Sequence, residues 1–272
     1  QALREQALPL KTRYQSELLR CGCVKMFMDG VIETYTGLLV DPYADNPTTC
    51  GDSNYSVEHF NRMVLEADRL GLQIFVHSVG DGGVRRVLNA YSLARQTNGK
   101  RDSRHRIEHI EVIHPEDLPR FRKLDVIASM QPLHSPPSVD DGDIWQFRVG
   151  ESRWPFSFAW ADIRKAGARL VFGSDWPVVS QNPMLGIHNT LNRKPWAAGL
   201  PHHHQDLADT LLSYTREAAF AEFQESVKGQ LKAGYLADLV LLSEDIFAIP
   251  PEQMKNVHPL MTMMGGQITF EE

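Results

Sequence analysis

Residues 74–81 read IFVHSVGD, an apolar run that ends in a histidine, a glycine and an aspartate. Its apolar residues predict a buried strand, and His77 stands at the carboxyl end of that strand. The Gly80-Asp81 pair then predicts a tight turn into the next element. A histidine in this position has a simple explanation as a core residue with a satisfied hydrogen bond. The rest of the chain decides whether that explanation holds.

Apolar strands and amphipathic helices alternate along most of the chain. The strand pattern covers residues 23–29, 73–78, 106–110, 126–132 and 169–175. The helical pattern covers residues 56–71, the segment after residue 78, residues 114–124, a segment near 156–167 and residues 206–222. This alternation predicts a parallel sheet with right-handed crossovers, in which consecutive strands are neighbours. For the first helix, Ser56 is a typical N-cap and Gly71 a typical C-terminal stop.

The C-terminal part has a different pattern. After residue 228 the sequence reads GQLKAGYLADLVLLSED and then LMTMMGGQITF, in which Gly265-Gly266 separates two apolar runs. Two such runs around a Gly-Gly pair predict an antiparallel hairpin. We therefore expect strand rather than helix in residues 229–245, and a small separate β unit at this end.

Composition and charge limit the class of protein. The 272 residues carry a net charge of −6, whereas proteins that bind nucleic acids usually present a basic face. No apolar run reaches the ~18 residues needed to cross a bilayer, and residues 1–20 lack the apolar core of a signal peptide. We therefore expect no nucleic-acid or membrane partner and a cytoplasmic location. Because the chain starts with Gln, we also expect a piece of a longer protein.

Ionisable residues stand where three of the predicted strands end. His77 ends one strand, His109 ends the next, and Asp175 ends the last. In parallel α/β folds, ligands and catalytic groups collect at the carboxyl ends of the strands. Core packing explains one such residue, but each of three would need its own buried partner. Imidazole and carboxylate groups are ligands of zinc, so the pattern predicts a divalent metal site.

Lys25 lies inside the first predicted strand, on the same side as Phe27 and Asp29 by two-residue alternation. An ammonium group cannot bind a metal ion. A lysine that has reacted with CO₂, however, becomes a carbamate, whose two oxygens can bridge two ions. The alternative is an ion pair of Lys25 with Asp29 or with a neighbouring strand, and spacing does not decide between the two.

Six segments resemble, in order, the motifs of the amidohydrolase superfamily. They are CVKMFMDGVIETYTGLL, IFVHSVGD, RHRIEH, SMQPLH, RLVFGSDWPV and GQLKAGYLADLVLL. They are most similar to the YtcJ-like branch, which includes N-substituted formamide deformylases. The resemblance implies a (β/α)₈ TIM barrel of which strands four to eight are present, with part of a flanking β-sandwich. We place the barrel in residues 1–225 and the sandwich segment in residues 226–272.

The resemblance also implies roles for single residues. Lys25 would be carboxylated and bridge two metal ions, and His77 and His109 would complete the site of the second ion. Asp175 would bind the first ion and carry the proton of the reaction. His134 would contact the substrate.

Further residues are candidates because of their positions. Trp176 is a candidate for the wall of a substrate pocket, or for ordinary packing. Arg153 is a candidate for holding an anionic group of the substrate, or for a surface salt bridge. Asp81 either orients a metal ligand or caps a helix. We place His202–His204 in a surface loop.

The chain departs from the family pattern in one large respect. Relatives carry a His-x-His pair on strand one, and no such pair precedes Lys25 here. Strands one to three and half of the sandwich are therefore expected to lie outside these residues. By itself the chain should hold at most about one zinc ion, weakly. An incomplete barrel exposes strand edges, which favours a homodimer.

These observations predict a metal-dependent hydrolase that cleaves amide-type, non-peptide C–N bonds of a small-molecule substrate, with one or two divalent ions such as Zn²⁺. Asp175 would take a proton from the attacking water and deliver it to the leaving nitrogen. An esterase or lactonase on the same site is the first alternative. A catalytically inactive fragment that binds a ligand or partner is the second.

Overall fold

The computed structural model describes residues 3–16, 18–136 and 144–272. Contacts between residues divide the chain into two compact units. The first contains residues 1–129 and 142–169, and the second contains residues 130–141 and 170–272. Among the described residues, no helix combines the length and the apolar character that crossing a bilayer requires.

Five strands form the sheet that the sequence predicts. They are β1 (Cys23–Phe27), β2 (Gln73–Ser78), β3 (Arg106–His109), β4 (Ile127–Met130) and β5 (Arg169–Phe172). The sheet order is β1-β2-β3-β4-β5, and β1 with β2, β2 with β3, and β3 with β4 pair in parallel. The predicted order of consecutive strands is confirmed. Closure into an eight-stranded barrel stays a prediction.

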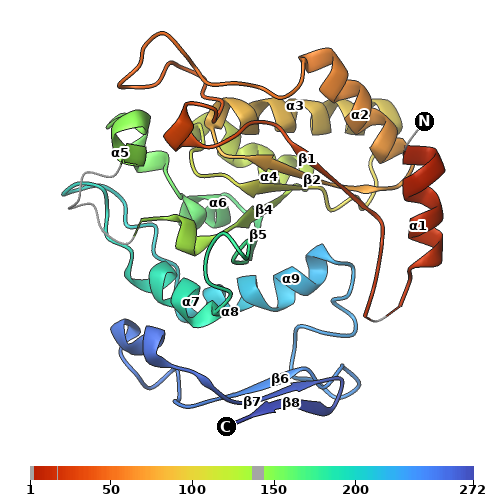
Figure 1. The fold of residues 1–272 in the computed structure, drawn as a ribbon, viewed down its shortest axis with the longest axis vertical. Helices are drawn as coiled ribbons and strands as arrows, with labels where there is room; N and C mark the ends of the chain where they lie inside the picture. The colour runs from red at the N-terminus through yellow and green to blue at the C-terminus, as the bar shows by residue number, and fades with distance from the viewer. Residues whose placement is uncertain (1–2, 17, 137–143) are drawn as a thin grey trace. The chain divides into compact units, whose positions relative to one another are not determined.

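Helices α2 (Val57–Arg69) and α3 (Asp81–Asn98) pack against β2 of this sheet. The other α-helices among the described residues of the first unit are α1 (Leu8–Arg13), α4 (Leu118–Leu124), α5 (Ile144–Val149) and α6 (Trp160–Lys165). Figure 1 shows α2 and α3 side by side over β1 and β2. Ile74 and Val76 of β2 are fully buried, whereas Lys25 and Phe27 of β1 are exposed. One face of the sheet therefore forms the core with the helices, and the other face carries Lys25.

A buried polar cluster lies near the amino ends of β2 and β3. Asp68 on α2 accepts hydrogen bonds from Arg101 Nε (2.7 Å) and Asn98 Nδ2 (2.8 Å). It also accepts one from His105 Nε2 (3.0 Å), while His105 Nδ1 accepts the Ile74 N–H (3.1 Å). Burial would raise the pKa of Asp68, but the hydrogen bonds and the charge of Arg101 lower it to about 2. Burial disfavours the charged imidazolium and lowers the pKa of His105, although the hydrogen bond with Asp68 opposes this shift.

Acidification should destabilise the protein through this cluster. The folded-state pKa of His105 lies below the unfolded value of about 6.5, so the unfolded chain takes up a proton that the folded chain does not. The free energy of unfolding should therefore decrease as pH falls below about 6.5. It should decrease again below about 4, where the unfolded chain protonates Asp68 while the folded chain holds its pKa at about 2.

Urea unfolding at a series of pH values measures this effect. The matched control is His105→Gln, which removes the titrating ring and should lose the upper part of the pH dependence. Identical pH dependence of unfolding in the parent and in this variant would show that His105 does not contribute.

The described residues of the second unit contain three α-helices and a small antiparallel sheet. The elements are α7 (Pro183–Asn192), α8 (Leu207–Tyr214), α9 (Arg216–Ala221), β6 (Leu239–Leu242), β7 (Pro259–Met264) and β8 (Gln267–Glu271). Gly265 and Gly266 have φ values of 56° and 82°, as a two-residue turn between antiparallel strands requires. The predicted hairpin is confirmed, and residues 229–245 contain β6 rather than helix. The division of the chain at residue 225 and the flanking sandwich stay predictions.

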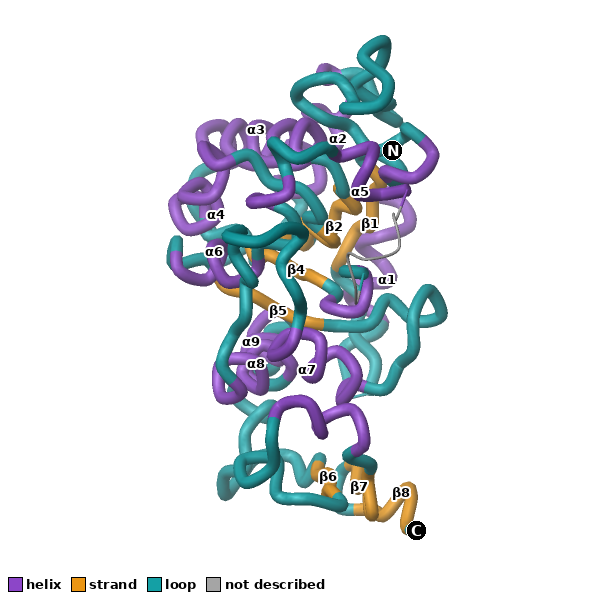
Figure 2. Tube along the Cα trace, turned by 90° about the vertical axis from the view of Figure 1, so that its left-hand side faces the viewer, coloured by secondary structure: helices purple, strands orange, loops and turns teal. Residues whose placement is uncertain are grey.

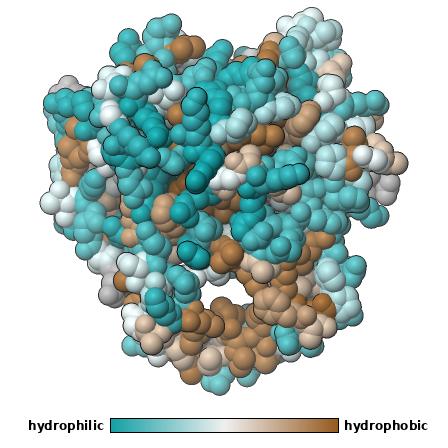
Figure 3. Space-filling model, turned by 180° about the vertical axis from the view of Figure 1, so that it is seen from behind, coloured by the Kyte–Doolittle hydropathy of each residue, from teal (hydrophilic) through white to brown (hydrophobic). Residues whose placement is uncertain are grey.

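The three-stranded sheet exposes apolar side chains. Figure 2 shows β6, β7 and β8 next to one another, with the C-terminus at the end of β8. Figure 3 shows apolar surface gathered over this part of the second unit. The exposed side chains, each 46–59% accessible, are those of Val240, Leu241, Met264, Ile268 and Phe270. Exposed apolar area of this kind marks an association surface or an aggregation liability. The homodimer stays a prediction.

Candidate active site

The carboxyl ends of β1, β2 and β3 gather predicted site residues in the first unit. The strand register pairs Phe27 with His77, and Ser78 with His109. Lys25 precedes Phe27 by two residues, so Lys25, Phe27 and His77 lie on the same face of the sheet. Three of the four predicted metal ligands therefore start from neighbouring strands at one end of this sheet.

The ring of His77 is held in one orientation. Its Nε2 lies 2.9 Å from the carbonyl oxygen of Gly30, and its centroid lies 5.2 Å from that of Phe27. A carbonyl oxygen only accepts hydrogen bonds, so Nε2 carries the proton of the neutral imidazole and the ring lone pair is on Nδ1. A histidine that donates one N–H to a backbone carbonyl is the usual form of a metal ligand.

His109 reaches the ring of His77 because its backbone has an unusual conformation. His109 and Ile110 have φ values of 79° and 53°, a left-handed conformation that a β-branched isoleucine rarely adopts. The Ile110 N–H donates to the Ser78 carbonyl (3.0 Å), which holds the turn. The strand alternation breaks here, and the ring centroids of His109 and His77 lie 4.4 Å apart. Backbone strain costs about 1–3 kcal/mol per residue and is concentrated at functional sites.

Asp29 supports His77, a role that the sequence pattern does not reveal. Its buried carboxylate accepts hydrogen bonds from the backbone N–H groups of Leu38 (2.9 Å), Val79 (3.0 Å) and Gly80 (3.0 Å). Asp29 Oδ1 lies 3.8 Å from His77 Nε2. Burial raises the pKa of Asp29 to about 7, although the backbone hydrogen bonds oppose this shift. Asp29 thus connects the end of β1 to the loop that follows His77.

Lys25 makes no ion pair within the part of the chain that the structure describes. Its Nζ lies 4.9 Å from the ring centroid of Phe27, in a cation–π contact. The alternative of a Lys25–Asp29 ion pair is wrong, because the Asp29 carboxylate is buried and bonds backbone N–H groups. Lys25 is exposed to solvent, which lets dissolved CO₂ reach its amine.

Asp81 holds backbone rather than contacting His77. It is the first residue of α3, directly after the N-cap Gly80. Its Oδ1 accepts the N–H groups of Val40 and Gly82, both at 2.9 Å, and burial raises its pKa. Asp81 therefore acts at the start of α3, which is close to the predicted role of a helix cap. The carboxylate next to His77 is that of Asp29.

Arg153 is also engaged with backbone. Its guanidinium donates to the carbonyls of Val149 (2.9 Å), Asp41 (2.7 Å) and Pro42 (3.0 Å). These hydrogen bonds connect the end of α5 to the loop at residues 41–42. They favour a structural role, and a contact of Arg153 with substrate stays a prediction.

The remaining predicted site residues belong to the second unit. Asp175 follows β5 in a turn, exposed and with a left-handed φ of 55°. Trp176 is 66% exposed, so the packing alternative for this residue is wrong. His134 ends a 3₁₀ turn, Pro132–His134, and Asn189 on α7 donates hydrogen bonds to carbonyls of this segment. The roles of Asp175, Trp176 and His134 stay predictions.

The surface assignment of His202–His204 is wrong for its middle residue. His203 is only 5% exposed and has a φ of 56°. His204 Nε2 donates to the Arg193 carbonyl (2.6 Å), which fixes this loop against α7. The segment is therefore part of the packing of the second unit.

The donor set of the first unit fits a divalent metal ion in its chemistry. Where the structure describes side chains, no group of three or more His, Cys, Asp or Glu residues is arranged to hold an ion. Among the predicted ligands in this unit, the imidazoles of His77 and His109 lie side by side. Imidazole suits a borderline-soft ion, and the Gly30 carbonyl already sets the tautomer of His77.

Comparison with known proteins identifies the family of this chain. A model described as "Amidohydrolase family" matches residues 2–270. The chain belongs to the amidohydrolase family. This amidohydrolase is 34% identical to the protein LONG AFTER FAR-RED 3 of Arabidopsis thaliana, over 93% of this chain and 43% of that protein. It is 30% identical to YtcJ of Bacillus subtilis (strain 168), described as a candidate amidohydrolase, over 92% of this chain and 47% of YtcJ.

A further relative is the N-substituted formamide deformylase of Arthrobacter pascens, 25% identical over 94% of this chain and 47% of that enzyme. The chain thus spans about half the length of the relatives it matches, and its place in the YtcJ-like branch is confirmed. Among solved structures, a metal-dependent hydrolase of Pyrococcus horikoshii superposes with a TM-score of 0.78 and 27% identity. That match covers 91% of this chain and 50% of the other.

Proposed function

We propose that these residues supply part of the active site of a zinc-dependent hydrolase that cleaves amide-type, non-peptide C–N bonds. The observation that carries the proposal is the adjacent pair of imidazoles, His77 and His109, at neighbouring strand ends. One ring has a fixed tautomer and the other stands on strained backbone. Membership in the amidohydrolase family and the metal-dependent hydrolases among the structural neighbours support it.

Lys25, His77 and His109 would hold one ion, and Asp175 is a proposed ligand of a second. The neutral amine of Lys25 adds to CO₂ and releases a proton, which leaves a carbamate with two ligand oxygens. His77 would bind through Nδ1, because Nε2 donates to Gly30. When bound, a divalent ion supplies Lewis acidity, which lowers the pKa of water and polarises a carbonyl group.

Asp175 is the proposed proton carrier. Its exposed carboxylate takes a proton from the attacking water, whose oxygen bonds to the amide carbon. The C–N bond then breaks, and the protonated Asp175 gives its proton to the leaving nitrogen. Trp176 and His134 are the proposed substrate contacts. The deformylase relative suggests N-substituted formamides as substrates, which yield formate and an amine.

Asp175→Asn should lower turnover of N-benzylformamide by about 10²–10⁴-fold, because the amide keeps the shape of the side chain but cannot accept the proton. The assay is release of formate by the zinc-loaded natural protein that contains these residues. Asp52→Asn is the matched control, since Asp52 is also an exposed aspartate in a loop, and it should leave turnover unchanged.

Benzyl formate tests the alternatives in the same assay. Faster turnover of the ester than of the amide would favour the esterase or lactonase. Full activity of the Asp175→Asn protein would contradict the role of Asp175. No turnover of either compound by the zinc-loaded parent would contradict the hydrolase and favour a protein that only binds a ligand or partner.

A further inference from the structure

A pocket opens between α2 and α3 of the first unit, away from the candidate active site. Its walls are apolar over most of their area and include Met28, Tyr55 and Phe60. Met28 and Phe60 are almost fully buried, and the Tyr55 and Phe60 rings stack with centroids 5.7 Å apart. The hollow encloses about 350 Å³, a value that includes space open to solvent. The apolar wall is thus preformed.

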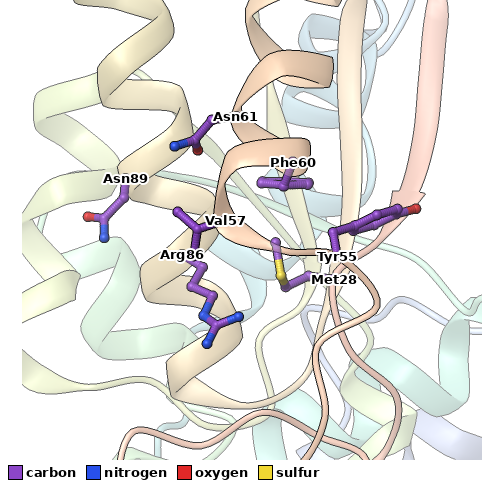
Figure 4. Close-up of a pocket in the computed structure, with 7 residues that line it drawn as sticks. All are labelled: Met28, Tyr55, Val57, Phe60, Asn61, Arg86 and Asn89. Atoms are coloured by element: carbon purple, nitrogen blue, oxygen red, sulfur yellow. The ribbon is translucent and has the colours of Figure 1, made fainter.

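Polar groups meet this apolar wall from the other side. Figure 4 shows Arg86 and Asn89 of α3 on one side of Val57, and Phe60, Tyr55 and Met28 on the other. Asn89 Oδ1 accepts a hydrogen bond from Arg120 (2.6 Å), so its NH₂ group is the one that remains to donate. The pocket therefore combines an apolar wall with hydrogen-bond donors.

Arg86 is the charged group of the pocket. It is partly buried, and its guanidinium makes no hydrogen bond or ion pair with any described residue. Its neighbour Arg85 behaves differently, because Arg85 Nε donates to Asp117 (2.8 Å). Arg120 Nη1 also donates to Asp117 (2.6 Å). The Asp117 carboxylate therefore already accepts hydrogen bonds from two arginines other than Arg86. A half-buried cation without a counter-ion attracts an anion that brings its own acceptors.

We propose that this pocket binds a small monocarboxylate with a short apolar chain or ring. The carboxylate pairs with Arg86 in the two-pronged manner that a guanidinium favours, and the amides of Asn61 and Asn89 lie within the same pocket. The apolar part lies against Phe60 and Met28. A single arginine suits one negative charge better than the two of a phosphate monoester.

The pocket is separate from the proposed hydrolase site. None of Lys25, His77 and His109 lines it. Met28 connects the two places, because its N–H donates to the carbonyl of His77 (2.9 Å) while its side chain lines the pocket. Carboxylate binding therefore requires no metal ion, and the proposal does not depend on the hydrolase.

Titration calorimetry of the purified chain with hexanoate, with a chelator present, tests the proposal. Saturable binding is expected at one site. Acetate should bind more weakly than butanoate and butanoate more weakly than hexanoate, by about threefold to fourfold for each added methylene until the pocket is full. Hexanol, which has the chain without the charge, should bind at least about tenfold more weakly than hexanoate.

Variants locate the site. Arg86→Gln should weaken hexanoate binding at least about tenfold, and Val57→Phe, which narrows the pocket, should also weaken it. Arg62→Gln on the exposed side of α2 is the matched control and should bind like the parent, as should His77→Ala. Thermal unfolding midpoints confirm that each variant folds. Parent-like binding by both pocket variants, loss of binding in His77→Ala, or no binding of hexanoate at millimolar concentration would overturn the proposal.

Discussion

Zinc binding by the purified chain should weaken at least about 100-fold when His77 is replaced by alanine, and by a similar factor for His109→Ala. Loss of a residue that only supports a metal ligand already costs about 10–100-fold in affinity, and loss of a ligand costs more. The ring centroids of His77 and His109 lie 4.4 Å apart, so each variant removes one imidazole of the same pair. The parent should bind about one ion per chain. Metal analysis and calorimetry with ZnCl₂ at neutral pH measure both quantities.

The matched control is His202→Ala, because His202 is exposed and stands in the second unit. It should bind zinc like the parent. Loss of binding in this variant, with retention in His77→Ala, would move the site to His202–His204. Two tightly bound ions in the parent would show that the chain holds ligands for a second ion beyond those proposed here.

Unfolding free energy should fall by about 3–5 kcal/mol when Asp68 is replaced by alanine. The Asp68 side chain is 4% exposed, and Arg101 Nε and His105 Nε2 both donate to its carboxylate. Removal of the carboxylate leaves Arg101 Nε and the buried His105 imidazole N–H without this acceptor, while Arg101 Nη2 keeps its hydrogen bond to the Leu72 carbonyl (2.7 Å). Such groups carry a full desolvation cost in the folded state. Urea unfolding at neutral pH, followed by circular dichroism, measures the change.

Glu66→Ala is the matched control on the same helix. Glu66 also pairs with arginines, Arg4 and Arg69, but on the surface of α2. Exposed ion pairs of this kind contribute little, so the unfolding midpoint should not move. Equal loss of stability in the two variants would show that the position on α2, and not the burial of the carboxylate, decides the effect.

The strands and the first long helix could be predicted because their signals are local. The predicted strand 73–78 and the observed β2, Gln73–Ser78, coincide. Ser56 Oγ accepts the His59 N–H (3.2 Å) at the start of α2, and Gly71 follows the helix with a φ of 69°. A polar residue after an apolar run marks the end of a strand, and this signal does not depend on the rest of the chain. The strand ends near His77 and His109 could therefore be predicted from the sequence.

Helix α7 shows where the local pattern is weak. Its apolar residues, such as Met184 and Ile187, are buried against the later segment Pro251–Asn256. That contact is distant in sequence, so residues 183–192 alone do not indicate which segment this helix packs against. A signal does exist in the Asn182-Pro183 pair, because Asn182 caps the helix by accepting the Met184 N–H (3.0 Å) and proline suits the first turn.

The candidate site depends on features that a sequence does not carry. The partners of Asp29 are N–H groups at Leu38, Val79 and Gly80, and these residues come together only in the folded chain. An acidic residue and a glycine directly after an apolar strand are the only local sign of its role. The position of His109 depends on two left-handed residues, and neither of them is a glycine. Backbone angles of this kind follow from the surrounding packing.

The exposed apolar side chains of β6–β8 should make any association through this sheet sensitive to temperature. Attraction between apolar surfaces is mostly entropic near room temperature and weakens on cooling. Ile268 and Phe270 stand on β8, the last strand of its sheet, where unpaired backbone groups add a second adhesive element. Any association through this sheet should therefore strengthen on warming and weaken on cooling or dilution.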